Sequence, residues 1–147
     1  MRSDLDIHIR RYGATVVVTP VGELDAASGW ALAAVHTALD HDVAAVACDM
    51  RRLSFLDVVG LHHLLGLARY TGSQGVALFA YNWQRQPQQL LDFTDELLLD
   101  SAQDSRAAPT RLLRRTLREA TEAARATGAA RAGTAGRRRQ HARGRPR

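Results

Sequence analysis

Side chains of the kinds that bind metals or act as nucleophiles are scattered through the first half of the chain: His36, His41, Cys48, His62 and His63. A structural zinc site needs ligands whose spacing lets them converge, such as H-x-x-x-H or C-x-x-C, and the sequence contains neither. His62 and His63 are adjacent, and adjacent residues of a helix point about 100° apart. We therefore expect histidines that face solvent or a protein partner, and no metal.

The arrangements used for covalent catalysis and phosphate binding are also missing from the sequence. No serine lies in a G-x-S-x-G turn, and Cys48 lies in an apolar run where a buried thiol would be inert. Residues 72–75, GSQG, are too short for a phosphate-binding loop and come before an expected strand instead of a helix. The sequence predicts no enzyme and no cofactor.

Length and composition favour a soluble, cytoplasmic protein. A chain of 147 residues suits one domain with an appendage, and its single cysteine excludes a disulfide framework and suits a reducing compartment. No apolar stretch approaches the roughly 20 residues of a membrane span, and the first residues lack the apolar core of a signal peptide. We expect no membrane association.

The net charge of +5 averages two unlike segments. Residues 1–105 carry a net charge of −6, whereas residues 106–147 carry +11, all of the positive charge being arginine. We predict a domain at 1–105, a possible arginine-rich amphipathic helix at 106–126 and a disordered basic tail at 127–147. The acidic domain would repel nucleic acid; the tail could bind it weakly through phosphate contacts, or be a solvated extension.

The elements that would position a site begin with a hairpin and a helix. Alternating apolar residues at 5–9 and the β-branched run at 14–21 predict two strands joined by a turn at Gly13. The alanine-rich residues up to about 39 predict a helix, with Asp25 or Ser28 available as its N-cap.

The second half of the domain alternates strands and helices. Residues 43–50 predict a buried parallel strand, residues 58–70 a helix capped by Asp57, and residues 76–81 another strand. A further helix is expected near Pro87, and residues 97–99 would add a short strand or turn. Trp30, Trp83 and Phe93 are expected in the core or at its rim. The order predicts an α/β fold: a small mixed β-sheet with helices packed mainly on one face.

Three segments in this order resemble the STAS domain of bacterial anti-sigma-factor antagonists. They are VVVTPVGELDAAS at 16–28, VACDMRRLSFLDVVGLHHLL at 46–65 and GVALFAYNWQRQPQQLLDFTDELL at 75–98. The middle one is similar to the family pattern of an acid, L-x-F-x-D and then S-S-G-L. The resemblance implies a STAS-like fold and docking onto an anti-sigma factor of the kinase fold, with phosphorylation of the serine after the motif aspartate switching the antagonist off.

This sequence departs from the pattern at the switch itself. Asp57 is followed by Val58 and Val59, and valine has no oxygen to phosphorylate. Two hypotheses follow: the protein binds its anti-sigma factor constitutively, or it serves as a scaffold or binding subunit for a different protein partner. Ser54 is a substitute phosphoacceptor in principle.

The resemblance implies a binding surface formed by Asp57, Val58, Val59, Gly60, His62 and His63, with Asp25 and Ser28 at its rim. Val58 occupies the degenerate phosphoacceptor position. Asp57 and Asp25 have an alternative interpretation as simple helix caps, and Gly60 is expected to permit a close approach in the first helical turn. The leading hypothesis is regulation of sigma-factor-dependent transcription by protein–protein contact.

Overall fold

The computed structural model describes residues 4–99 and 110–142, and these contain a mixed sheet of five strands. The strands are β1 (Leu5–Tyr12), β2 (Thr15–Leu24), β3 (Ala45–Asp49), β4 (Leu53–Leu56) and β5 (Ala77–Tyr81). Their order is β1-β2-β3-β5, with β4 also paired to β2. β1 and β2 form the predicted antiparallel hairpin, and the other pairings are parallel.

The long strand β2 organises the sheet because it has different parallel partners along its length. Residues 15–18 pair with β3, and residues 22–24 pair with β4. Strand β4 was not predicted from the sequence. It has only four residues, and its two middle side chains are both exposed, so the alternation that identifies a strand is missing.

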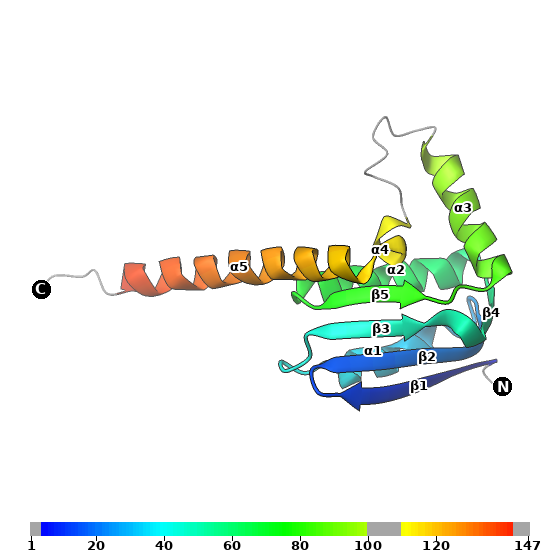
Figure 1. Cartoon of the computed structure of the whole chain (residues 1–147), viewed down its shortest axis with the longest axis horizontal. Coiled ribbons are helices and arrows are strands. Elements are labelled where there is room, and N and C mark those ends of the chain that lie inside the picture. The colour runs from blue at the N-terminus through cyan, green and yellow to red at the C-terminus, as the bar shows by residue number, and fades with distance from the viewer. Residues whose placement is uncertain (1–3, 100–109, 143–147) are drawn as a thin grey trace, which may run out of the picture.

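The helices cover one face of this sheet and one of its edges. They are η1 (Gly29–Leu32), α1 (Ala33–Ala38), η2 (Met50–Arg52), α2 (Val58–Ser73), α3 (Arg85–Leu99), α4 (Arg111–Arg114) and α5 (Leu117–Ala142). α1 and α2 lie behind the sheet in Figure 1, and α4 and α5 run beside β5. The predicted fold class, a small mixed sheet with helices mainly on one face, is confirmed.

The core lies between the sheet and the helices on its covered face. Val16, Val18 and Val46 are buried, as are Leu61 and Leu64 on the inner side of α2. The alternation of buried and partly exposed residues along β2 is that of a strand with one covered face. Leu91, Leu113 and Ala120 are also buried, so α3, α4 and α5 contribute to the packed interior.

Several predicted elements differ from those observed. The first helix is broken into η1 and the short α1; Ser28 occupies the N-cap position of η1 without a side-chain cap bond, and Asp25 lies in the turn before it. Residues 97–99 continue α3 instead of forming a strand or turn. The expected single helix at 106–126 is interrupted at Arg115, whose extended backbone separates α4 from α5.

Helix α5 also continues to Ala142, past residue 127 where the sequence predicts disorder. Alanine and arginine are strong helix formers, so this composition favours a helix even without side chains large enough to pack. The predicted tail at 143–147 and the segment at 100–109 lie outside the described residues.

The edge strand β5 and the short strand β4 are each covered by other parts of the chain. Helices α4 and α5 lie along the free edge of β5. At β4, the side-chain amide of Gln86 accepts a hydrogen bond from the Leu56 N–H at 2.9 Å and donates one to the Leu56 carbonyl at 2.8 Å. Gln86 thus takes the place of a neighbouring strand, which satisfies backbone groups that an open edge leaves free.

The parallel strands bring three loops together at one end of the molecule. β2, β3 and β5 all run toward the right in Figure 1, so the segments after β2 and β5 and the start of α2 meet there. The expected site residues Asp25 and Asp57 lie in these loops.

Candidate functional site

Asp57 ties the start of α2 to the loop that follows β2. Its carboxylate accepts a hydrogen bond from the Gly60 N–H at 2.6 Å, which is the bond of a helix N-cap. The other carboxylate oxygen accepts from the Ala26 N–H at 3.4 Å, and the Asp57 N–H donates to the Leu24 carbonyl at 3.2 Å. Asp57 is therefore a cap that also joins two segments about thirty residues apart.

Asp25 and Ser28 form a closed turn beside this cap. The Asp25 carboxylate accepts from the N–H groups of Ala27 at 2.9 Å and Ser28 at 3.1 Å. The Ser28 hydroxyl donates to the Glu23 carbonyl at 2.9 Å and accepts from the Asp25 N–H at 2.9 Å. Ser28 is only 2% exposed, so this residue, expected at the rim of a binding surface, is an internal support of the turn.

Gly60 lies where α2 presses against the end of β2. A Cβ placed on Gly60 would lie 2.8 Å from the Leu24 carbonyl carbon and closer still to its oxygen. The close approach expected for Gly60 is thus confirmed. This close approach places the first turn of α2 directly against the end of β2, beside the Asp25 turn.

Val58 and Val59 are the residues of this turn that face outward. Their side chains are 67% and 44% exposed, which is unusual for β-branched apolar residues. Both belong to the first turn of α2, where backbone N–H groups have no partner inside the helix. An apolar pair is therefore presented at the positive end of a helix, on a backbone fixed by Asp57 and Gly60.

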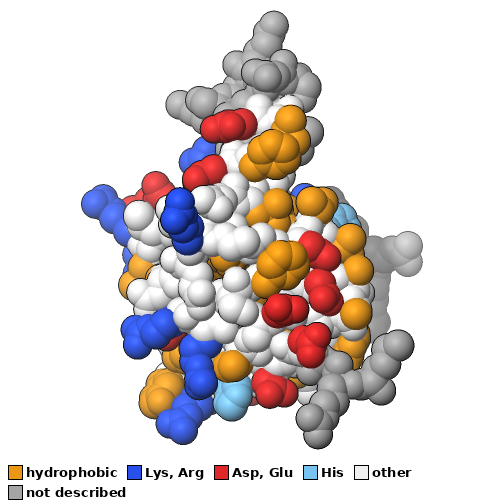
Figure 2. All heavy atoms as spheres, turned by 90° about the vertical axis from the view of Figure 1, so that its right-hand side faces the viewer, with side chains coloured by type: hydrophobic (Ala, Val, Ile, Leu, Met, Phe, Trp, Pro, Cys, Tyr) orange, Lys and Arg blue, Asp and Glu red, His pale blue; other side chains and the backbone are white. Residues whose placement is uncertain are grey.

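The same end of the molecule carries acidic and apolar side chains side by side (Figure 2). Glu23 is exposed and Asp25 and Asp57 are partly exposed, and Phe55 on β4 is 39% exposed. The surface expected to bind a partner is thus an apolar patch with an acidic border, which suits a partner with apolar and basic side chains.

His62 and His63 lie one turn further along α2 and do not join the Asp57 network. They line a groove of about 480 Å³ between α2 and the η1–α1 segment. The His63 ring lies over Gly29, where an added Cβ would come within 2.7 Å of its Cγ. Their ring centroids are 6.4 Å apart, and no group of three or more possible metal ligands occurs within the described residues.

Trp30 and His36 complete the groove and were not identified as site residues from the sequence. Trp30 is 69% exposed, although it was expected in the core or at its rim, and His36 packs against Tyr70 with ring centroids 4.4 Å apart and ring planes tilted by 45°. A single tryptophan in an alanine-rich segment resembles a core residue. Its neighbours Gly29, Ala31 and Leu32 in η1 are buried, and Trp30 lies on the exposed side of that turn.

Cys48 and Ser54, the remaining candidates for covalent chemistry, are not placed to react. Cys48 is fully buried in β3, and burial raises the pKa of its thiol to about 12, so it stays protonated at neutral pH. The exposed Ser54 donates its hydroxyl to the Gly22 carbonyl at 3.0 Å. None of the helices in the described part of the chain is long and apolar enough to cross a membrane.

The STAS domain family matches residues 6–102. The chain belongs to this family. The match ends before α4, yet Leu113 of α4 and Ala120 of α5 are buried against the matched part, so in this member the packed unit extends beyond the STAS segment.

Other comparisons give more distant relatives. No curated protein matches the chain. Among solved structures, the anti-sigma factor antagonist SpoIIAA in its unphosphorylated form is 21% identical, with a TM-score of 0.47, over 67% of this chain and 98% of that one. An anti-sigma factor antagonist from Mycobacterium paratuberculosis is 23% identical, with a TM-score of 0.44, over 68% of this chain and 95% of that one.

Proposed function

We propose that this STAS domain is an anti-sigma-factor antagonist that binds an anti-sigma factor of the serine-kinase fold and thereby regulates sigma-factor-dependent transcription in the cytoplasm. The observation that carries the proposal is the exposed pair Val58 and Val59 in the first turn of α2. These residues follow Asp57 in a segment that resembles the docking motif of such antagonists. The protein acts by contact, without catalysis and without a cofactor.

The valine pair supports binding without a phosphorylation switch. A kinase needs a hydroxyl group that can enter its active site, and Val58 and Val59 have none. Ser28 is buried and hydrogen-bonded in its turn, and the hydroxyl of Ser54 is held by the Gly22 carbonyl. The antagonist would therefore remain active when the kinase is active, and its control would come from its own abundance or from another ligand.

The geometry of the first turn of α2 supports docking of the partner on the valine pair. Two exposed valines that lose their water on docking contribute about 1–2 kcal/mol each at about 25 cal/mol per Å² of apolar area. Their backbone is fixed by the cap of Asp57 and the contact of Gly60 with Leu24, so little ordering is needed on binding. A negative charge in this patch would have to be desolvated beside the carboxylates of Asp25 and Asp57, which opposes docking.

The test uses the full chain and purified kinase-fold anti-sigma factors, with affinity measured by calorimetry. We expect the wild type to bind equally with ADP and ATP, and Val58→Asp to bind at least about tenfold more weakly because it places a charge in the apolar contact. Val58→Ser should bind and then be released by kinase and ATP. Leu117→Asp is the matched control, because Leu117 is 52% exposed on α5, away from this surface, and it should bind as the wild type does.

Two outcomes would contradict the proposal. If neither the wild type nor Val58→Ser binds any kinase-fold anti-sigma factor, the partner class is wrong. If mass spectrometry finds phosphate on Ser54 of the wild type, the protein is switchable and constitutive binding is wrong.

The second candidate is a scaffold or binding subunit for a different protein partner. The loss of both hydroxyl residues at 58 and 59 favours it, since a domain that has left the kinase circuit no longer needs them. Recovery of another partner that depends on Val58, with no anti-sigma factor bound, would favour this candidate.

A further inference from the structure

A second hollow, of about 260 Å³, lies on the side of the molecule away from the valine pair. It is enclosed by the second half of α2, the link between α4 and α5, and the first turns of α5. Its lining residues are Ala68, Arg69, Gly72, Val76, Leu112, Arg115, Ala120, Ala123, Ala124 and Thr127. Small apolar side chains form most of the walls, and two arginines are the charged groups among them.

Within residues 4–99 and 110–142, these two arginines have no partner of opposite charge. The side chains of Arg69 and Arg115 make no hydrogen bond or ion pair with any residue that the structure describes. Neighbouring arginines are used differently: Arg114 binds Asp92 at 2.7 Å, and Arg118 binds Glu122 at 3.0 Å. Arg69 is exposed and Arg115 is partly buried, and guanidinium groups beside a largely apolar hollow favour an anion with complementary oxygens.

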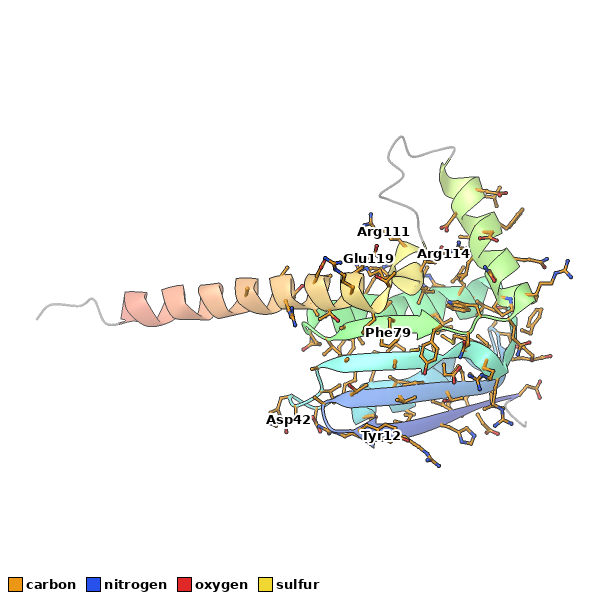
Figure 3. The ribbon with its side chains drawn as sticks, viewed as in Figure 1. Tyr12, Asp42, Phe79, Arg111, Arg114 and Glu119 are labelled. Atoms are coloured by element: carbon orange, nitrogen blue, oxygen red, sulfur yellow. The ribbon has the colours of Figure 1, made fainter. Side chains whose placement is uncertain are left out.

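The nearest acid along the chain is already engaged. Glu119 accepts a hydrogen bond from the Thr116 N–H at 3.1 Å, and the Thr116 hydroxyl accepts one from the Glu119 N–H at 3.2 Å. This reciprocal pair is a capping box that begins α5. Arg111, Arg114 and Glu119 gather around the α4–α5 link (Figure 3), and within the described residues Glu119 forms this cap and no ion pair with Arg115.

The end of α2 does not need the arginines either. Basic side chains often bind the last carbonyl groups of a helix. Here backbone N–H groups already take them: Gln74 donates to the carbonyls of Tyr70 and Thr71, Gly75 donates to that of Gly72, and Val76 donates to that of Thr71. Arg69 is therefore not a helix cap.

Helix α5 passes the turn after α2 at an ordinary packing distance. A Cβ added to Gly75 would lie 3.7 Å from both the Ala124 carbonyl oxygen and the Gly128 nitrogen. Gly75 has a φ of 71°, which favours glycine, so the turn that receives α5 is defined by its backbone conformation. Arg69 on α2 and Arg115 just before α5 both line the space beside this turn.

We propose that this hollow binds a small amphipathic anion, with an oxyanion head held by Arg69 and Arg115 and a short apolar body against the alanine-lined walls. Guanidinium groups bind carboxylate and phosphate oxygens in a planar, bidentate way, which fits either kind of head group. The space equals that of about nine water molecules at roughly 30 Å³ each, so the body is a short chain or one ring. Because α2 begins at the valine pair and ends at this hollow, the ligand would bind the same helix as the protein partner does.

The experiment titrates the full chain by calorimetry with three probes: hexanoate, hexyl phosphate and inorganic phosphate. We expect one saturable site for the first two, and at least about tenfold weaker binding of inorganic phosphate because it has no apolar body. Affinity should fall as salt is raised. No saturable binding of either hexyl probe, or equal affinity for hexyl phosphate and inorganic phosphate, would overturn the proposal.

Variants separate a built site from general attraction to an arginine-rich segment. Arg69→Gln and Arg115→Gln should each weaken binding about tenfold. Arg69→Lys, which keeps the charge but removes the planar fork, should also weaken it. The control is Arg125→Gln, since Arg125 lies on α5 and does not line the hollow. Equal loss in Arg125→Gln would show diffuse attraction and refute the site. Unliganded circular dichroism spectra and melting curves that match the wild type check that the variants fold.

Discussion

Replacing Gly60 with alanine tests how α2 is held against the sheet. An added Cβ would lie 2.8 Å from the Leu24 carbonyl carbon and 3.1 Å from its Cγ, whereas ordinary contacts begin at 3.4 Å. The main chains must separate by at least 0.6 Å (3.4 less 2.8). The carbonyl that must move also accepts the Asp57 N–H, so the shift strains a hydrogen bond between the two loops.

The sign of the effect follows from comparing opposing contributions. Overpacking costs about 1–3 kcal/mol and a weakened hydrogen bond about 1 kcal/mol. Alanine favours a helix over glycine by up to about 1 kcal/mol. We expect Gly60→Ala to lower the free energy of unfolding by about 1–3 kcal/mol, measured by urea denaturation followed by circular dichroism. The binding surface should also weaken, because Val58 and Val59 move with the turn.

Gly66 in the same helix is the matched control. A Cβ there meets nothing within 4 Å, so Gly66→Ala gains the helix preference without a clash and should raise the free energy of unfolding by up to about 1 kcal/mol. If both variants change stability in the same direction and by the same amount, the close contact with Leu24 does not determine the result and the reasoning is wrong.

Three further predictions concern the packing of the domain. Leu113→Ala should lower the free energy of unfolding by about 2–5 kcal/mol, because Leu113 is 1% exposed. Leu117→Ala, on the exposed side, should change it by less than about 0.5 kcal/mol. Equal, small effects of both variants in urea denaturation would mean that α4 is not part of the folded unit. Gln86→Ala should cost about 1–3 kcal/mol and speed hydrogen exchange at the Leu56 N–H, and unchanged exchange by NMR would contradict the amide clip. The Cys48 thiol, with a pKa of about 12, should resist a disulfide reagent at pH 8 in the native protein and react fully in urea; rapid native reaction would contradict its burial.

The sequence predicted well those features that depend on neighbouring residues. The hairpin and helix α2 have apolar patterns that identify them, and the strand around Val46 is a short continuous apolar run typical of a buried strand. The cap formed by Asp57 and the need for glycine at position 60 were also expected, since both belong to one helix start. The lack of a hydroxyl group at positions 58 and 59 could be read directly from the sequence motif.

Features that depend on contacts between distant segments were missed. Strand β4 exists because it pairs with the far end of β2, and no pattern in four residues shows that. Ser28 was expected at a rim but is buried, because the Asp25 turn folds inward against the Glu23 carbonyl. Helix α5 packs along β5, although its composition suggested a basic helix followed by a tail. The division of the chain at residue 105 remains a prediction.

The chain alone thus determined the fold family, the order of most elements and the absence of a hydroxyl group after Asp57. The fold family follows from the three segments that resemble STAS domains, and the other two properties follow from residue type and short-range patterns, all of which a linear sequence carries. Only the tertiary structure gave the exposure of Val58 and Val59, showed that Trp30 lines a groove with the histidines, and brought Arg69 and Arg115 to a hollow whose described lining contains no acid. Exposure and pairing are properties of the whole packed surface, because each depends on what distant segments cover.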